Sequence, residues 1–292
     1  MAFAGDIAKS RLHFDRAFAF YDPVEHRPLA ARVSVDSAVS IFSYRSWVGW
    51  FLGHPQAALA DANQAISDAR QLGQAATLMY ALWHTSVTQT ECGNYVRASA
   101  QLEEAIALAD EKGSVHWKAL ATASRGCVFA LTGDASKAIQ VIMTGIIAFR
   151  STGLRTMLPV FLSWLAWAYA KLDYSDDARR SISEAISVME TSKEAWFEAE
   201  VHRIAGEIAL MSPQPDIANA EAYFERALVV ARAQQAKSWE LRAAMSMARL
   251  WRDQGKRDEA HDLLAPVYGW FTEGFDTLDL KEAKALLEEL AA

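Results

Sequence analysis

The sequence has few of the residues that interrupt helices or crosslink a chain. Among its 292 residues there are seven prolines, fourteen glycines and two cysteines. The cysteines, Cys92 and Cys127, supply neither a disulfide framework nor the spacing of a metal site, and they are compatible with a reduced compartment. The scarcity of proline and glycine allows ordered helix along most of the chain.

Long hydrophobic runs are also missing. The longest apolar run, from Met157 to Ala170, contains Pro159 and Ser163 and is about fourteen residues long, whereas a membrane-spanning helix needs about twenty. The first residues, Met-Ala-Phe-Ala-Gly-Asp, lack the pattern of a signal peptide. We therefore expect a cytoplasmic protein in which this run is a helix buried between neighbours.

Positive charge is in deficit. The chain has 29 lysines and arginines against 36 aspartates and glutamates, which gives a formal net charge of −7. A chain with this balance does not attract nucleic acid or an anionic membrane surface as a whole. Neither is expected as a partner.

Motifs that carry chemistry are absent from the sequence. The seven histidines show no ligand spacing, no Gly-x-Ser-x-Gly occurs, and Gly255-Lys256-Arg257 lacks the rest of a phosphate-binding loop. Neighbouring acids such as Glu103-Glu104 and Asp176-Asp177 lie on predicted solvated helix faces. No catalytic residue, metal or cofactor is predicted, and the chain is expected not to be an enzyme.

What the sequence does contain is a period of forty residues. Gly53, Gly93 and Gly133 are forty apart, and Asp173 takes the next place. A separate column holds alanine at the same step: Ala58, Ala98, Ala138 and Ala178. A fixed period of this size is typical of stacked supersecondary units, each of which needs only its neighbours for stability.

Helical spacing of apolar residues places two helices in each period. Residues 5–32 are predicted to be an unpaired first helix, over 5–22, and a polar connection. The first helix resembles the second half of a repeat, so its stacking face is expected to be open and the chain to be cut from something longer. Residues 33–272 are predicted to form six hairpins: 33–52 with 55–72, 74–92 with 94–112, 114–132 with 134–152, 154–172 with 174–192, 194–211 with 216–234, and 236–254 with 256–272.

Residues 273–292 are predicted to close the stack. They hold a loop and a last helix from Leu280 to Leu290, which is apolar on one side and polar on the other, as the terminal helix of a repeat array must be. Asp279 and Glu282 have the spacing of a capping box at the start of this helix.

Small residues recur on the first helix of each hairpin and would let its two helices approach closely. This column is Ser46, Ser86, Gly126, Ala166, Gly206 and Ala248. Together with the alanine columns and the larger residues between them, the pattern resembles the tetratricopeptide repeat (TPR), with six residues more than its usual thirty-four. The resemblance implies an all-α fold, a right-handed superhelical solenoid of TPR-like hairpins that forms a single domain over 1–292.

The C-terminal part carries a narrower resemblance. The segments 235–244, 249–256, 260–276 and 279–287 are similar to the C-terminal TPR region of bacterial signalling proteins that contain a class III adenylate/guanylate cyclase domain and an AAA-type ATPase. The similarity covers most of the chain and is most specific over 235–287. It implies a sensor or partner-binding arm, but the catalytic domains of that family have no counterpart in this sequence.

In TPR arrays the first helices line a concave groove, which is the candidate binding site. The first four hairpins are expected to show aromatic residues there, and the last two charged ones. The candidates are Trp47, Trp50, Tyr80, Trp83, Trp167, Glu200, Arg203, Glu207, Arg242 and Arg249. Aromatic and charged anchors suit an extended peptide, whereas the alternative is that the tryptophans pack in the interior and the charges pair with one another.

Three functions remain open. The first is a non-catalytic scaffold that binds a protein or peptide in its groove, as the regulatory TPR region of a bacterial signalling system. The second is a small-ligand sensory module, and the third is a detached regulatory part of a nucleotide cyclase/ATPase. Replacing Trp83 and Arg203 together by alanine is predicted to abolish capture of a partner. A homodimer through the open face of the first helix is a further expectation.

Overall fold

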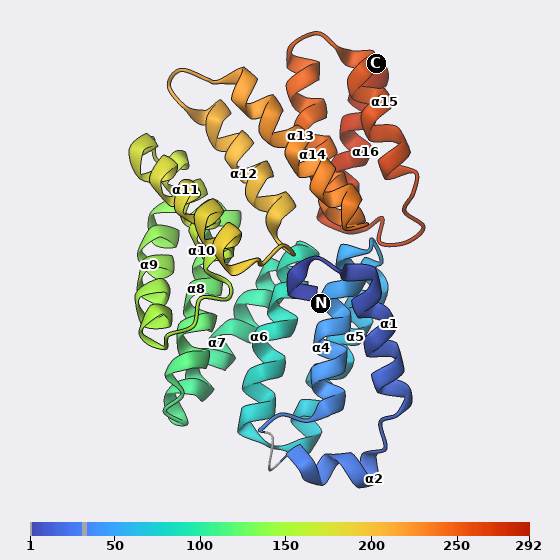
Figure 1. The fold of residues 1–292 in the computed structure, drawn as a ribbon, viewed down its shortest axis with the longest axis vertical. Helices are drawn as coiled ribbons and strands as arrows, with labels where there is room; N and C mark the ends of the chain where they lie inside the picture. The colour runs from blue at the N-terminus through green and yellow to red at the C-terminus, as the bar shows by residue number, and fades with distance from the viewer. Residues whose placement is uncertain (1, 31–33) are drawn as a thin grey trace. The chain divides into compact units, whose positions relative to one another are not determined.

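The computed structural model describes residues 2–30 and 34–292, and this part of the chain is helical without a strand (Figure 1). The N-terminal helices are η1 (Ala2–Ala4), α1 (Ile7–Ala19), α2 (Pro23–His26), η2 (Arg27–Leu29), α4 (Ser37–Phe51), α5 (Pro55–Leu72), α6 (Ala75–Glu91), α7 (Tyr95–Glu111), α8 (Val115–Leu131) and α9 (Ala135–Ser151). The remaining helices are α10 (Leu158–Lys171), α11 (Ser175–Ser192), α12 (Glu198–Met211), α13 (Ile217–Ala233), α14 (Lys237–Asp253), α15 (Arg257–Tyr268) and α16 (Leu278–Ala291).

The chain divides into two compact units. The C-terminal unit consists of Met1–Ile7, Phe51–His54 and Thr156–Ala292, and the N-terminal unit consists of Ala8–Trp50 and Pro55–Arg155. The sequence-based expectation of one continuous solenoid domain remains a prediction.

The helix pattern expected from the sequence is confirmed. Each helix predicted for the six hairpins has a counterpart among α4–α15, and α7, for example, spans Tyr95–Glu111 where 94–112 was expected. Two first helices begin about four residues late, α10 after Met157 and α12 after Phe197. The loops before them include left-handed residues, Met157 at φ 77° and Lys193 at φ 57°, and a helix cannot continue through that conformation.

The polar connection after the first helix is also more ordered than the sequence indicated. It contains the short helices α2 and η2, while residues 31–33, including the predicted first residue of the first hairpin, lie outside the described part of the chain. The first hairpin begins at Ser37 because Asp36 caps it. The Asp36 carboxylate accepts hydrogen bonds from the backbone N–H groups of Ala38 at 2.9 Å and Val39 at 3.1 Å.

The glycines that recur every forty residues lie at helix C-termini that share the same hydrogen-bond pattern. At the end of α6, Gly93 has φ 78°, its N–H donates to the carbonyl of Thr90, and the next N–H, of Asn94, donates to the carbonyl of Gln89. This pair of hydrogen bonds is a Schellman motif, which satisfies carbonyls left over at the helix end. The same pairs close α7, α8 and α10, and Asp173 supplies the left-handed position after α10 with φ 62°.

Close approach of paired helices follows from the small-residue column. A Cβ atom added to Gly126 on α8 would lie 2.5 Å from Cγ1 and 2.7 Å from the backbone nitrogen of Ile142 on α9. One added to Gly206 on α12 would lie 2.5 Å from the ring of Phe224 on α13. Only a residue without a side chain fits such contacts, so the predicted role of this column is confirmed at both glycines.

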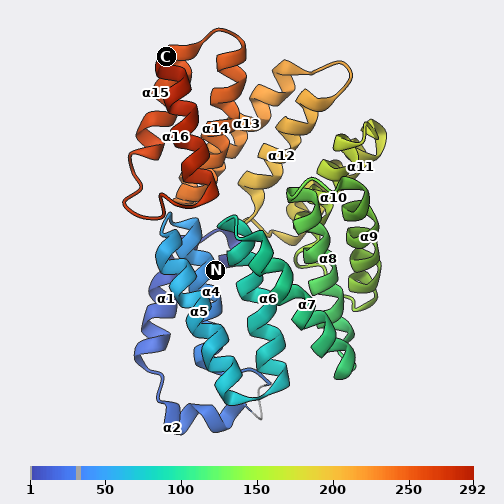
Figure 2. The same ribbon diagram turned by 180° about the vertical axis from the view of Figure 1, so that it is seen from behind.

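In the C-terminal unit the first helices form a row. Helix α10 packs against α12, α12 against α14 and α14 against the last helix, α16 (Figures 1 and 2). The apolar side of α16 is buried, as the sequence predicted for a closing helix: Leu280, Ala283, Leu286 and Leu290. This arrangement places α12 and α16 on two sides of α14.

The predicted capping box is wrong. Helix α16 begins at Leu278, with Thr277 as its N-cap and no capping hydrogen bond from that side chain. Asp279 is therefore already inside the first turn, where it cannot cap. Its carboxylate instead accepts a hydrogen bond from Arg242 on α14 at 2.8 Å.

Helix α1 covers one side of α4 in the N-terminal unit. Phe14 stacks on Tyr44 with ring centroids 5.6 Å apart, and Phe18 contacts Phe42 at 4.8 Å. Away from this contact α1 leaves Leu12 about half exposed. The predicted dimer through this helix remains a prediction.

Candidate functional site

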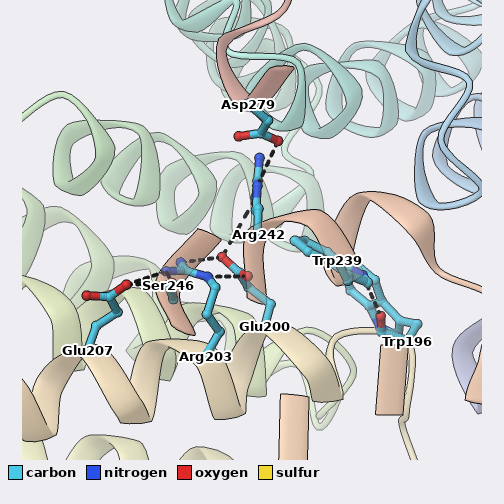
Figure 3. A network of polar contacts seen from close by, with 8 residues as sticks. All are labelled: Trp196, Glu200, Arg203, Glu207, Trp239, Arg242, Ser246 and Asp279. Carbon is cyan, nitrogen blue, oxygen red and sulfur yellow. Dashed lines mark hydrogen bonds and ion pairs between the residues drawn. The ribbon is translucent and has the colours of Figure 1, made fainter. Parts of the chain in front are cut away.

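The charged candidates of the last two hairpins form a network in the C-terminal unit (Figure 3). Arg203 and Glu200 lie one turn apart on α12. The guanidinium of Arg203 donates through Nε to one carboxylate oxygen of Glu200 at 2.8 Å and through Nη2 to the other at 2.7 Å. Such two-point pairing is the strongest form of ion pair between these groups.

The same guanidinium reaches a second acid. Nη1 of Arg203 donates to Oε1 of Glu207, one turn further along α12, at 3.3 Å. The hydroxyl of Ser246 on α14 donates to the same oxygen at 2.6 Å. Ser246 is buried, so this contact fixes the neighbouring first helix against α12.

Arg242 joins all three helices. From α14 its Nε donates to Oδ2 of Asp279 on α16, and its Nη1 lies 3.7 Å from Oε1 of Glu200 on α12. Its guanidinium also lies 5.2 Å from the ring centre of Trp239, a cation–π distance. Trp239 is itself held by a 3.1 Å hydrogen bond from its indole N–H to the carbonyl of Trp196 (Figure 3).

Burial sets the electrostatics of this network. Glu200 is 1% exposed; burial opposes its ionisation, but Arg203 and Arg242 outweigh burial and hold its pKa below the ordinary value. Burial likewise opposes the charge of Arg203, yet Glu200 and Glu207 raise its pKa. For Asp279 burial prevails over Arg242 and the pKa is raised. The charges therefore pair with one another, as the alternative interpretation of the sequence had it.

The remaining charged candidate lies at the rim of the network. Nη2 of Arg249 on α14 is 2.8 Å from Oε2 of Glu282 on α16, and both side chains are about two-fifths exposed. An exposed pair of this kind contributes little to stability. It is accessible to a partner, unlike Glu200.

The aromatic candidates of the first two hairpins lie in the N-terminal unit and are mostly interior. Trp47, Trp50 and Trp83 are 3–4% exposed, and Tyr80 is partly exposed. The indole of Trp83 donates to Ser124 at 3.0 Å. These tryptophans pack as core, so they cannot serve a partner as exposed anchors without a rearrangement, and Trp83→Ala would test packing before it tested binding.

Trp167, the last aromatic candidate, is on α10 in the C-terminal unit. It is partly exposed, and Nζ of Lys171 lies 4.6 Å from its ring centre. Its ring also contacts Trp164 at 6.2 Å. Of the tryptophan candidates it is the one that a partner could reach.

Sequence reasoning missed His84, which is the centre of the aromatic cluster. Its ring stacks on Tyr80 with centroids 3.8 Å apart and on Trp47 at 5.1 Å, and its Nδ1 lies 2.9 Å from the Tyr80 carbonyl. Burial lowers its pKa to about 3, so the ring is neutral at ordinary pH and Nδ1–H donates to that carbonyl. A lone histidine in a helix carries no spacing signal that could have shown this.

Residues 2–30 and 34–292 lack two kinds of feature that would point to other functions. No group of three or more histidine, cysteine, aspartate or glutamate side chains is arranged to hold a metal ion in these residues. No helix among them has the length and hydrophobicity to cross a membrane.

Known proteins show what this fold resembles. A family model described as anaphase-promoting complex subunit 5 matches residues 40–127 and 148–197, less than half of the chain. Curated protein sequences give no match. The apo form of RapI is similar in structure, with a TM-score of 0.61 and 14% identity over 97% of this chain and 99% of that one.

Two further solved structures are similar to this chain over nearly its whole length. A Rap protein complexed with competence and sporulation factor gives a TM-score of 0.63 and 12% identity over 97% of this chain and 80% of that one. A tetratricopeptide repeat protein from Parabacteroides merdae gives a TM-score of 0.56 and 13% identity over 97% of this chain and 100% of that one. At these identities the likeness establishes the fold, and the chain is a TPR-like helical-repeat protein.

Proposed function

We propose that the chain is a non-catalytic scaffold that binds a protein or peptide on the first-helix face of its C-terminal unit. The observation that carries this proposal is the network of Glu200, Arg203, Glu207, Arg242 and Asp279, which brings ionic groups from α12, α14 and α16 together. Ion pairs within a core are costly to desolvate and are a poor means of stabilising a fold. Their partial exposure at one face is consistent with a use in recognition.

Two further points support this function. A structurally similar Rap protein was solved with competence and sporulation factor bound, so the fold can hold a ligand of that kind. The sequence also resembles the TPR region of bacterial cyclase/ATPase signalling proteins. We propose that the chain serves as the regulatory or sensor arm of such a system in the cytoplasm.

The test uses the more accessible members of the face, Glu207 at 21% and Arg249 at 39% side-chain exposure, because the buried Glu200 holds the fold. Glu207→Ala with Arg249→Ala removes one acid and one base from the first-helix face. The matched control, Glu225→Ala with Lys256→Ala, removes the same charges from exposed positions elsewhere in this unit. Partners captured from a cell extract by the wild-type chain are identified by mass spectrometry, and the dissociation constant of each purified partner is measured.

The face variant is expected to weaken binding at least tenfold while the control does not, with equal helicity by circular dichroism. Equal binding by both variants would exclude this face as the site. Turnover of ATP to cyclic AMP or to ADP by the isolated chain would contradict a non-catalytic role.

A small-ligand sensor is the second candidate, and one cavity favours it. A space of about 380 Å³ lies among α10–α13 beside the long junction after α12, within the range of small-molecule sites. Its lining combines apolar residues such as Ile182 and Ile208 with polar ones such as Ser183, Asn219 and Tyr223.

A metabolite that fits this cavity should raise the melting temperature of the wild-type chain. Ile208→Trp, which would fill the space, should abolish the shift. The same shift in both proteins would place the ligand elsewhere.

A further inference from the structure

The network on the first-helix face is not electrically balanced. It contains three carboxylates, on Glu200, Glu207 and Asp279, and two guanidiniums, on Arg203 and Arg242. The adjacent pair of Arg249 and Glu282 is neutral and does not alter this count. One negative charge is therefore left without a cation.

Asp279 is the acid with the weakest compensation. Glu200 faces two guanidiniums, and Glu207 receives Arg203 together with the Ser246 hydroxyl. Asp279 has Arg242 alone, which it shares with Glu200. In the described residues its Oδ2 accepts from Arg242 while its Oδ1 has no hydrogen-bond donor.

An uncompensated carboxylate in a largely buried site is costly, since low local dielectric strengthens its need for a counter-charge. Asp279 is less than one-fifth exposed, and two other carboxylates, Glu200 and Glu282, act on it with like charge. Its raised pKa agrees with this imbalance. A proton can neutralise this excess negative charge, and so can a cation supplied from outside the chain.

We infer that the first-helix face recognises a peptide segment through one cationic side chain, lysine or arginine, which binds the Oδ1 side of Asp279. This inference rests on the proposed binding function and names the chemistry of its partner. The charge count excludes an acidic side chain at this position, because it would add a fourth carboxylate.

The experiment selects phage-displayed random heptapeptides on the intact chain. Wild-type protein should enrich peptides with lysine or arginine at one position. Asp279→Asn, which keeps the shape of the side chain, should lose this preference. Asp276→Asn, three residues earlier and exposed, should retain it.

A synthetic peptide with the selected sequence then gives the size of the effect. Replacing its cationic residue by norleucine should raise the dissociation constant for wild-type protein about 10- to 100-fold, as expected for a hydrogen-bonded charge pair. This comparison needs no protein variant and so does not depend on how Asp279→Asn folds.

The outcomes separate the two proposals. If no peptide sequence is enriched, this inference fails, and the binding function fails with it if the cell extract also yields no partner. If peptides are enriched without a cationic residue, or if Asp279→Asn and norleucine leave binding unchanged, this inference fails and the binding function stands.

Discussion

Gly126 on α8 and Ile142 on α9 are so close that a methyl group on Gly126 would overlap the backbone of Ile142. A Cβ atom at Gly126 would lie 2.7 Å from the Ile142 nitrogen. Backbone cannot move aside as a flexible side chain can. The hairpin of α8 and α9 therefore depends on this glycine.

Gly126→Ala is expected to lower the free energy of unfolding by about 1–3 kcal/mol, the usual cost of overpacking, although alanine is the better helix former. The measurement is urea unfolding followed by circular dichroism. Gly49→Ala is the control, because a Cβ there meets nothing closer than 3.5 Å. It should leave stability unchanged or raise it. Equal stability of the Gly126 variant and wild type would show that the helices can separate freely.

Asp173→Gly should stabilise the chain by about 1 kcal/mol, because a residue with a side chain is strained in the left-handed conformation that Asp173 adopts. Thermal and urea unfolding both test this. Asp134→Gly is the matched control: Asp134 caps α9 at negative φ, so its replacement should destabilise slightly. A loss of stability in the Asp173 variant would contradict the interpretation that the backbone of Asp173 is strained.

Arg203→Met should cost about 3–5 kcal/mol, because it leaves the buried carboxylate of Glu200 with only a 3.7 Å contact to Arg242. Adding Glu200→Gln should recover much of the loss, since the charge that needed a partner is then gone. Urea unfolding of the single and double variants gives the coupling. Additive losses would mean that the two residues act independently.

His84 should make the fold sensitive to acid. Its pKa is about 3 in the fold because burial excludes the charged form, and about 6.5 in the unfolded chain. The unfolded state therefore binds the extra proton between these values, and stability falls as the pH decreases through 6.5 toward 3. The dependence of the urea midpoint on pH should flatten in His84→Gln. The exposed His13→Gln should retain the wild-type slope; a similar slope in both variants would contradict the assignment.

Glu194 should change the stability of the fold with pH in the direction opposite to His84. Burial raises its pKa to about 7, against a weaker opposing hydrogen bond from the Met157 backbone. The folded state then holds a proton that the unfolded state has lost, so this residue reduces stability as the pH rises from about 4.5 to 7. Relative to wild type, Glu194→Gln should gain stability across that range in melting experiments. Glu225→Gln, at an exposed position, should not.

Much of the fold could be predicted because its determinants are local. The glycine column at Gly53, Gly93 and Gly133 marks left-handed helix ends, and the small column at Gly126 and Gly206 marks close helix contacts. Both depend on residue type at fixed spacing, which a sequence displays directly. The late starts of α10 and α12 could not be predicted, because Met157 and Lys193 are not residues that signal a left-handed turn.

The site was harder to predict because its contacts join residues distant in sequence. Arg203 and Glu200 are three apart, and their pairing was one of two interpretations that the sequence left open. The contact between Arg242 and Asp279 spans 37 residues, and the local spacing of Asp279 with Glu282 suggested a cap instead. Burial of Trp47 and Trp83 likewise depends on neighbouring hairpins, so sequence periodicity could not separate core from surface.

The Schellman turns have a consequence for how such chains vary. At Gly93 both closing hydrogen bonds join atoms within six consecutive residues, Gln89 to Asn94. Each Schellman turn is thus closed by hydrogen bonds within its own residues and needs no contact with the helix that follows. A duplication or deletion of forty residues between two Schellman turns would leave the hydrogen bonds of every turn intact. Evolution can therefore lengthen or shorten the array by whole repeats.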